Sequence, residues 1–298
     1  MDIKLNNPAL IKAIKFMHSI VENEDLEKHR ESEQTVSELF GRNRNVSFTS
    51  SKVKDIPILW TRPKKPHSKK AVILYCHGGG YITGSAQYSK GTTAKLAESL
   101  LCDVISFDYK LAPENPCPSA LNDAMKIWDY LMYCGYGAEN VIICGDSAGG
   151  NLALTLSLRI KDQGRMMPKA LVLFSPWTDL TKSGESYESR AEIDPVLTEE
   201  YIDQAINYYV GDNMDKLTHP YVSPLFGDFK DFPPTLIQVG TNEILYSDSE
   251  MLKDVMERFN VNVKFEVYDG MWHVFQMTPF ETAYEAMDNI AQFIIDLK

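Results

Sequence analysis

A Gly-x-Ser-x-Gly motif at residues 145–149 is the strongest sign of chemistry in this 298-residue chain. The motif follows the apolar run 141–144 and precedes an apolar helical pattern, so it predicts a sharp strand-to-helix turn. Gly145 and Gly149 leave room for that turn, and the hydroxyl of Ser147 would be held beside the positive end of a helix. The alternative is a glycine-rich turn in which the serine has no chemical role.

A serine hydroxyl is a weak nucleophile until a base removes its proton. Of the six histidines, only His273 follows the last predicted strand, at 263–268. That is where a strand-turn-helix serine site places its base, in the chain order serine, acid, histidine. A glycine-containing loop after the strand could carry the imidazole over Ser147. A packed structural histidine is the competing interpretation, and the position after the last strand argues against it.

The acid that orients such a histidine is expected in the loop after the preceding strand, at 235–239. Glu243 and Asp248 both lie in that stretch. Glu243 is nearer the end of the strand, and therefore nearer the edge of the sheet where such sites assemble. We favour Glu243 and keep Asp248 as the alternative, with Asp269 as a weaker third candidate. The carboxylate that is not used is expected to cap the helix beginning near Ser249.

Attack on a carbonyl group creates a negatively charged oxygen, which needs hydrogen-bond donors already in place. Residues 77–80, with the sequence His-Gly-Gly-Gly, directly follow the predicted strand 71–76. We expect the backbone N–H groups of Gly79, Gly80 and Ala148 to bind that oxygen. The supporting residues of the two motifs are His77, Gly78 and Asp146. A phosphate-binding loop is the alternative, but the Gly-x-x-x-x-Gly-Lys arrangement of such loops is missing.

Short apolar or alternating runs predict the elements that position these residues. Eight strands are expected, at 45–50, 56–61, 71–76, 104–107, 141–144, 170–174, 235–239 and 263–268. Helical patterns lie between most of the later strands, at 89–101, 123–133, 150–162 and 249–259, and a closing helix is expected at 280–297. This alternation predicts an α/β fold with a mainly parallel, doubly wound sheet covered on both faces. The first two strands are expected to pair antiparallel.

Two segments do not follow the strand-helix alternation. Residues 8–22 carry an apolar stripe at helical spacing, which predicts a helix outside the sheet that either closes the core or covers the site. Residues 178–222 are rich in Thr, Ser, Glu and Tyr and contain no convincing strand. Within them, Thr198 is expected to begin a helix over 201–210 that stops at Gly211. A long strand-free insertion of this kind often forms a lid or a specificity region.

The composition excludes several classes of partner. With 30 basic and 41 acidic residues the net charge is −11, which argues against binding to nucleic acid or to anionic membrane surfaces. No apolar stretch is long enough to cross a bilayer and no secretion signal is evident, so we expect a cytoplasmic protein. The cysteines show no zinc-site spacing, predict no metal site, and are expected to be reduced core thiols. They are Cys76, Cys102, Cys117, Cys134 and Cys144.

The motifs together resemble those of the hormone-sensitive-lipase-like esterases of the α/β-hydrolase superfamily. The resemblance covers roughly residues 70–280 and rests on 77–80, 108–114, 145–151, 221–225 and the paired prolines Pro233-Pro234. It implies an eight-stranded hydrolase core at 46–177 and 223–298, with a cap built from 1–45 and 178–222. It also implies carboxylic ester hydrolysis without a cofactor.

Carried over by position, the resemblance implies Ser147 as nucleophile, Glu243 as acid and His273 as base. The chain departs from many relatives in having a glutamate where they have an aspartate, but either carboxylate can orient an imidazole. The implied substrates are small esters with short acyl chains, cleaved through an acyl-enzyme. A small apolar substrate would suit the apolar residues expected in the cap, which are Phe16, Met17, Tyr208 and Tyr209.

Three questions stay open at the level of sequence. A carbohydrate acetyl esterase or an amide deacetylase would use the same chemistry on the same fold. A non-catalytic ligand-binding protein is the other alternative, since the plant gibberellin receptors resemble this family but lack the catalytic histidine; the presence of His273 argues against it. Finally, the strand at 263–268 could pair with its copy at an open sheet edge and form a homodimer.

Overall fold

The sheet contains all eight expected strands. The protein is described here by a computed structural model, which covers residues 11–12, 14–15, 25–31, 43–67, 70–212 and 214–297. The strand order is β1-β2-β4-β3-β5-β6-β7-β8. The strands are β1 (Val46–Val53), β2 (Ile56–Pro63), β3 (Val72–Cys76), β4 (Asp103–Phe107), β5 (Val141–Asp146), β6 (Ala170–Phe174), β7 (Thr235–Gly240) and β8 (Val263–Tyr268).

Strand direction changes at one side of the sheet. β2 pairs antiparallel with both β1 and β4, and every other neighbouring pair is parallel. Every residue of β3, β4, β5 and β6 is buried, which explains their continuous apolar sequences, because parallel strands are covered on both faces. The predicted α/β-hydrolase fold with an eight-stranded, mostly parallel sheet is confirmed.

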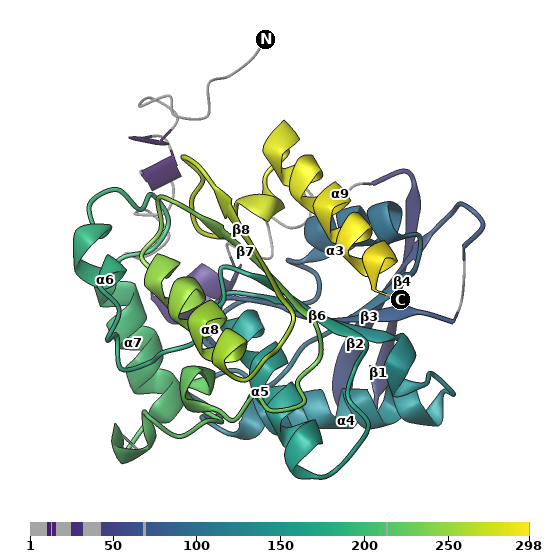
Figure 1. The fold of residues 1–298 in the computed structure, drawn as a ribbon, viewed down its shortest axis with the longest axis horizontal. Coiled ribbons are helices and arrows are strands. Elements are labelled where there is room, and N and C mark those ends of the chain that lie inside the picture. Colours follow the sequence, from purple (N-terminus) through teal and green to yellow (C-terminus); the bar gives the residue numbers. More distant parts are fainter. Residues whose placement is uncertain are drawn as a thin grey trace.

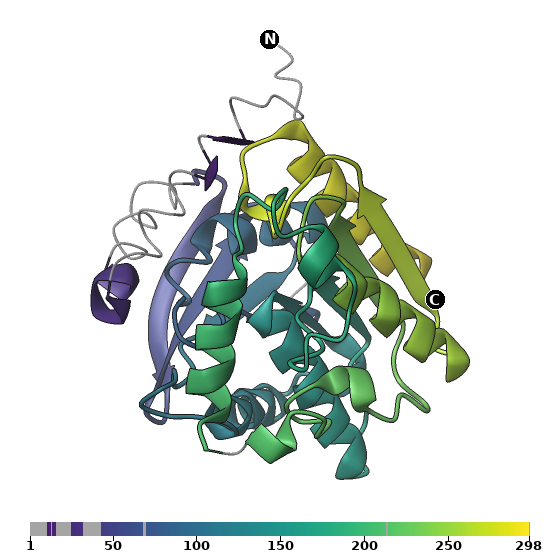
Figure 2. The same ribbon diagram turned by 90° about the vertical axis from the view of Figure 1, so that its left-hand side faces the viewer.

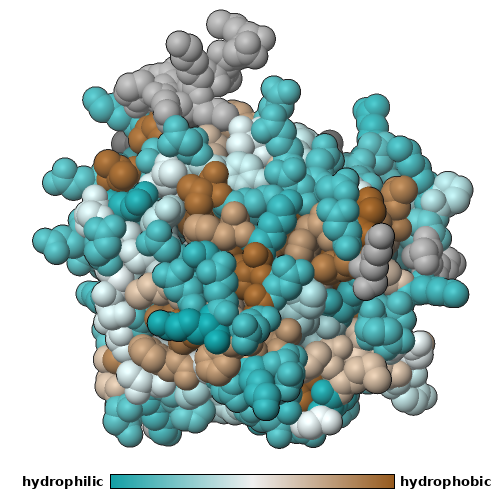
Figure 3. All heavy atoms as spheres, viewed as in Figure 1, coloured by the Kyte–Doolittle hydropathy of each residue, from teal (hydrophilic) through white to brown (hydrophobic). Residues whose placement is uncertain are grey.

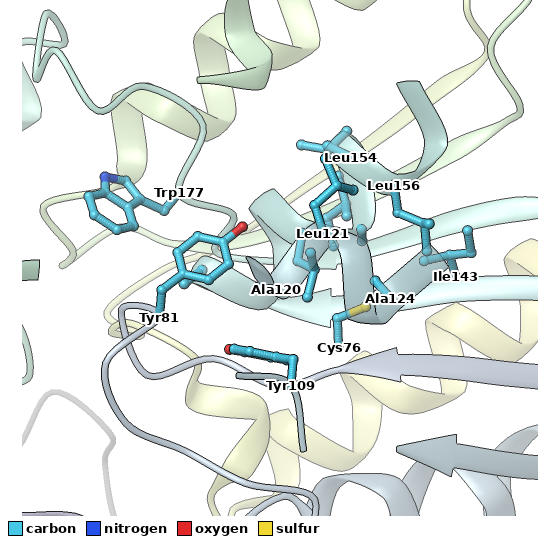
Figure 4. Close-up of a cluster of buried hydrophobic side chains, with 14 of the residues drawn as sticks. Cys76, Tyr81, Tyr109, Ala120, Leu121, Ala124, Ile143, Leu154, Leu156 and Trp177 are labelled. Carbon is cyan, nitrogen blue, oxygen red and sulfur yellow. The ribbon is translucent and has the colours of Figure 1, made fainter. Parts of the chain in front are cut away.

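Helices cover both faces of this sheet (Figures 1 and 2). On one face, α3 and α9 pack against strand residues such as Ile73 and Val104. On the other face, α4, α5 and α8 pack in a second core, part of which is drawn in Figure 4 around Ile143 and Leu154. The helices are α3 (Lys90–Leu100), α4 (Ser119–Tyr133), α5 (Ala148–Asp162), α6 (Ser186–Ser189), α7 (Glu199–Val210), α8 (Tyr246–Arg258) and α9 (Glu281–Asp296).

The short 3-10 helices lie in the connections. They are η1 (Ala138–Asn140), η2 (Met214–Lys216), η3 (Pro224–Phe226) and η4 (Phe275–Met277). The carboxyl ends of β5, β6, β7 and β8 therefore lead into loops at one edge of the sheet, because these strands run in parallel. Glu243 and His273 lie in the loops after β7 and β8, the serine motif lies at the turn after β5, and the His-Gly-Gly-Gly motif lies in the loop after β3.

Several element boundaries differ from the sequence-based expectation. α4 begins at Ser119 rather than 123, directly after Pro118, because Ala120 and Leu121 already face the core. β1 extends to Val53, where it still pairs with β2. The sequence did not predict α6, because this helix is only one turn long and most of its residues are polar.

The helix expected within residues 178–222 is present as α7. The Thr198 side chain accepts a hydrogen bond from the N–H of Tyr201 at 3.2 Å, so Thr198 is the N-cap, and Gly211 follows the last turn. Residues 26–31 are also helical. From them, Arg30 donates to the carbonyl oxygens of Ile82 and Ala112, both at 2.8 Å, which fixes this short segment to the core.

Most of the segment expected as an N-terminal helix, including Phe16 and Met17, lies outside the described residues. All five cysteines are free, but Cys134 is exposed and Cys117 only half-buried, so the expectation that all are core thiols is wrong for these two. On the face drawn in Figure 3, hydrophilic side chains separate small apolar patches.

None of the helices in the described part of the chain is long and apolar enough to cross a membrane. Over the same residues, no group of three or more histidine, cysteine, aspartate or glutamate side chains is arranged to hold a metal ion.

Candidate active site

The turn between β5 and α5 holds Ser147 in a conformation that L-residues rarely adopt, with φ 55° and ψ −122°. The residues two positions before and after it must be glycine. A Cβ atom on Gly145 would lie 2.2 Å from the carbonyl oxygen of Gly149, and a Cβ atom on Gly149 would lie 2.1 Å from that of Cys76. Strain of this kind persists only where the surrounding structure enforces it, and it is common at functional sites.

His273 and Glu243 meet in the loops that follow β8 and β7. His273 Nδ1 lies 2.9 Å from Glu243 Oε2, and both side chains are buried. Glu243 Oε1 accepts two further hydrogen bonds, from the N–H of Gly240 at 2.6 Å and from Ser175 Oγ at 2.9 Å. The carboxylate is therefore fixed by three partners from three segments of the chain.

Ser175 joins the loops around the site and was missed by the sequence analysis. It directly follows β6, and its Oγ, which donates to Glu243, also accepts the N–H of Val274 at 3.2 Å. The preceding residue, Phe174, accepts the N–H of Ser147 at 2.9 Å. A polar residue directly after a fully buried strand, at the same sheet edge as the motif serine, is the signal that could have found it.

Ser147 Oγ has no hydrogen-bond partner among the residues that the structure describes. The charge of His273 favours the ionised form of Asp146, the residue before Ser147. Catalytic hydrogen bonds are commonly long in enzymes without substrate and shorten in the reacting complex.

Three backbone N–H groups near the turn have no partner among the described residues. Those of Gly79, Gly80 and Ala148 donate to no acceptor in the described part of the chain. Gly79 has φ 102° and Gly80 has φ 60°, which glycine tolerates at low cost. Ala148 is the first residue of α5, where N–H groups have no partner within the helix. Unpaired N–H groups of this kind are available to bind a negatively charged oxygen.

The supporting residues of the two motifs hold the loop after β3 against the turn. A Cβ atom on Gly78 would lie 2.2 Å from Asp146 Oδ2, so only glycine fits there. Asp146 Oδ1 accepts the hydroxyl of Tyr75 at 2.5 Å. His77 bonds through Nδ1 to the carbonyl oxygen of Gly78 at 2.8 Å and stacks on Tyr109 with ring centroids 4.0 Å apart.

Burial and nearby charges shift the pKa values of the site's side chains in opposite directions. Burial alone would lower the pKa of His273, but the hydrogen bond and charge of Glu243, with the charges of Asp194 and Asp146, raise it above its ordinary value. Burial raises the pKa of Asp146 to about 6, although hydrogen bonds from Tyr75 and Gly78 oppose that rise. Burial lowers the pKa of His77, which favours the neutral ring.

The other two candidate acids, Asp248 and Asp269, bond to groups other than His273. Asp248 Oδ2 accepts the N–H groups of Thr178 and Asp179, at 2.7 and 2.8 Å, and so holds the loop that opens the 178–222 insertion. It does not cap α8, as was expected of the unused carboxylate, because α8 begins at Tyr246 with Leu245 as its N-cap. Asp269 accepts a 3.3 Å bond from the Thr241 hydroxyl at the surface.

Another carboxylate that acts on His273 gave no signal in the sequence. Asp194 lies in the 178–222 insertion, is 1% exposed, and accepts the N–H of Ile244, the residue after Glu243, at 2.8 Å. Burial raises its pKa to about 6, and the charge of His273 opposes that rise. It stands in a polar, irregular stretch, so no periodicity marked it as buried.

Comparison with known proteins agrees with this geometry. Residues 73–277 match the model of a family described as having an alpha/beta hydrolase fold. The structure superposes with a TM-score of 0.90 on an esterase from the bacterial hormone-sensitive lipase family, at 28% identity, over 97% of this chain and 98% of the other. The chain belongs to the hormone-sensitive-lipase family of carboxylic ester hydrolases.

Two sequence relatives agree with this assignment to a family of esterases. An esterase of Acinetobacter venetianus is 39% identical over 236 residues, which is 78% of each chain. An acetyl-hydrolase of Streptomyces hygroscopicus is 34% identical over 216 residues, covering 72% of this esterase and 71% of the other protein. The expected family, enzyme class and fold are thereby confirmed, while the roles of individual residues stay predictions.

Proposed function

We propose that this esterase cleaves carboxylic esters with short acyl chains through an acyl-enzyme on Ser147. In this proposal His273 is the general base, Glu243 orients it, and the N–H groups of Gly79, Gly80 and Ala148 bind the oxyanion. The hydrogen bond between His273 Nδ1 and Glu243 Oε2, at the sheet edge that bears the Ser147 turn, is the observation that carries the proposal.

In the first step, His273 Nε2 takes the proton of Ser147 Oγ while Oγ forms a bond to the ester carbonyl carbon. The carbonyl oxygen becomes an oxyanion held by the three backbone N–H groups. When the tetrahedral intermediate collapses, the bond to the alcohol oxygen breaks and His273 gives that oxygen its proton. The alcohol leaves, and the acyl group stays on Ser147.

In the second step, His273 takes a proton from water as the water oxygen attacks the acyl carbon. The second tetrahedral intermediate uses the same N–H groups. Its collapse breaks the bond to Ser147 Oγ, which recovers its proton from His273, and a carboxylic acid leaves. Glu243 accepts the hydrogen bond from Nδ1–H throughout and stabilises the imidazolium that forms in both steps.

The limited space over Gly80 supports a small substrate. A Cβ atom at Gly80 would lie 3.0 Å from the Tyr201 hydroxyl and 3.1 Å from the Ala205 side chain, so α7 lies directly over this part of the loop. Tyr209, also on α7, stacks on Tyr81 with ring centroids 3.8 Å apart. The Streptomyces relative is named an acetyl-hydrolase, which also favours a short acyl group.

The test is steady-state hydrolysis of p-nitrophenyl esters from acetate to laurate. Wild-type kcat/KM should be highest for the short chains, and Ser147→Ala should reduce turnover of the acetate to near background. Retained turnover in Ser147→Ala would refute the role of Ser147. A rate that rises toward laurate would refute the short-acyl part of the proposal and leave the mechanism standing.

The alternatives share the mechanism and differ in the substrate. Matched ester and amide substrates, together with acetylated sugars, separate a simple carboxylesterase from an amide deacetylase or a carbohydrate acetyl esterase.

Two proposals concern the domains and the assembly. The proposed cap comprises residues 1–45 and 178–222, and the proposed core comprises 46–177 and 223–298. A homodimer through the edge strand β8 is a further proposal, and size-exclusion chromatography would test it.

A further inference from the structure

The insertion at 178–222 contacts the loop that carries Glu243 at several points on both sides of that residue. The Arg190 guanidinium donates to the carbonyl oxygen of Thr241, two residues before Glu243. Ser186 Oγ donates to the carbonyl oxygen of Ile244 at 2.5 Å and accepts the N–H of Ser247 at 2.9 Å. The loop is therefore held by polar groups of the insertion from Thr241 to Ser247.

Asp194 completes these contacts directly beside the acid. One carboxylate oxygen accepts the N–H of Ile244 at 2.8 Å, and the other accepts the N–H groups of Val196 and Leu197 at 2.8 and 3.0 Å. One side chain thus ties the insertion's own turn to the residue after Glu243. Buried hydrogen bonds to an ionised group are the strong ones, and an unpaired buried N–H is costly.

Arg190 is also fixed from its other side. Its guanidinium stacks over the Tyr246 ring, 3.9 Å from the centroid, and Tyr246 is the first residue of α8. The Arg190 carbonyl oxygen accepts the N–H of Asp194 at 3.0 Å. The three contact residues therefore belong to one hydrogen-bonded segment, which includes α6 and the turn after it.

We propose that residues 186–197 act as a fixed brace for the Glu243 loop, with Asp194 as its positioning residue. This brace rests on the proposed roles of Glu243 and His273 and deepens them. A lid that opens during turnover would have to break the contacts at Thr241, Ile244 and Ser247 together, and would release Glu243 each time. Any moving part of the cap therefore lies outside residues 186–197.

Asp194 also contributes charge to the base. His273 is faced by Glu243 from the loop after β7, by Asp146 from the end of β5, and by Asp194 from the insertion. All three carboxylates favour the protonated imidazole, which is the form that appears in the transition state. Removing one of them should lower the pKa of His273, so that the acidic limb of kcat/KM moves to lower pH.

The experiment compares three variants with the wild-type enzyme, using p-nitrophenyl acetate across a pH series. Asp194→Asn removes the charge and places an amide donor in the cluster of N–H groups. We expect kcat to fall roughly tenfold to hundredfold, since displacement of a catalytic group by about 1 Å can cost that much. KM should change little, and the acidic limb should move to lower pH.

Ser186→Ala separates position from charge and guards against failure of Asp194→Asn to fold. It removes two contacts of the brace and no charge, so kcat should fall while the acidic limb stays in place. Asp179→Asn is the matched control. Asp179 is another buried carboxylate of the insertion, it bonds within its own turn to Thr181 and Ser183, and its charge is not among the largest that act on His273. It should leave the acidic limb unmoved.

Labelling of the wild-type enzyme by a fluorophosphonate separates failure of the brace from failure of the proposed function. If Ser147 is labelled but Asp194→Asn and Ser186→Ala keep kcat within twofold of wild type, the brace is refuted and the triad stands. If Asp179→Asn moves the acidic limb as far as Asp194→Asn does, the specific contribution of the Asp194 charge to His273 is refuted. If Ser147 is not labelled at all, the proposed function itself fails.

Discussion

At the scale of residues, contact with His273 distinguishes the two candidate acids better than their distance along the chain does. Glu243 and Asp248 are both buried carboxylates, but only Glu243 bonds to His273, while Asp248 is occupied with backbone N–H groups at the start of the insertion. The spacing of residues in the sequence favoured Glu243 only because it is nearer the strand. The geometry supplies a physical reason, since two donors, the N–H of Gly240 and the hydroxyl of Ser175, hold the Glu243 carboxylate in line with the imidazole.

Glu243→Gln should abolish most of the activity without unfolding the protein. The amide keeps the volume of the side chain but no longer stabilises the imidazolium or holds Nδ1 protonated, so kcat should fall by about 10³- to 10⁴-fold. The pKa of His273 should also fall, because Glu243 raises it, and any residual activity should have its acidic limb at lower pH. Asp248→Asn is the control, and a comparable loss of kcat with a shifted limb in that variant would reassign the acid.

At the scale of elements, the turn from β5 into α5 shows how closely the backbone segments pack. Gly149 lies against the carbonyl oxygens of Cys76 and His77, at 2.1 and 2.4 Å from where its Cβ atom would be. These oxygens belong to the backbone and cannot rotate away. The glycine is therefore required for the loop after β3 to approach the serine turn.

Gly149→Ala should lower the free energy of unfolding by on the order of 3 kcal/mol or more, because a backbone clash has no cheap relaxation. Gly91→Ala is the matched control within α3, where nothing lies within 4 Å of the added Cβ atom. That change should stabilise the helix by about 0.5–1 kcal/mol. Urea denaturation measures both, and equal effects of the two substitutions would contradict the packing argument.

The elements and the motif turn were predictable because their signals are local. The apolar run of β5 and the glycines around Ser147 mark a buried strand and a sharp turn without reference to the rest of the chain. The partners of Ser175 and Asp194 were not predictable in this way, since they lie some fifty to seventy residues distant; the position of Ser175 after a buried strand was its only local signal. The early start of α8 has the same origin, because Ser247 in its first turn is bonded to Ser186 rather than to a local cap.

At the scale of the whole molecule, the protein carries buried carboxyl groups that resist ionisation. Burial raises the pKa of Asp248 to about 7, and that of Asp146 and Asp194 to about 6. Asp248 Oδ1 has no hydrogen-bond partner in the described part of the chain. Folding therefore binds protons at these sites, and the fold depends on pH through residues far apart in the sequence.

The direction in which pH changes the free energy of unfolding follows from the linkage between proton binding and folding. A carboxyl group whose pKa is higher in the folded state contributes stability that is complete below its ordinary pKa of 3.8 and is lost as the pH rises through about 7. Asp248→Asn removes that contribution. The free energy of unfolding of the wild type should therefore fall relative to the variant between about pH 4 and pH 7, as urea denaturation at stepped pH would show. A difference that stays constant over this range would contradict the assignment.

The central claim is that Ser147 becomes covalently acylated, and covalent labelling tests it most directly. The wild-type enzyme is treated with a fluorophosphonate, digested, and mapped by mass spectrometry. We predict one added phosphonyl group on the peptide that contains Ser147, no addition in Ser147→Ala, and loss of esterase activity in proportion to labelling. Labelling of a different residue, or an unlabelled enzyme that still hydrolyses p-nitrophenyl acetate, would contradict the account.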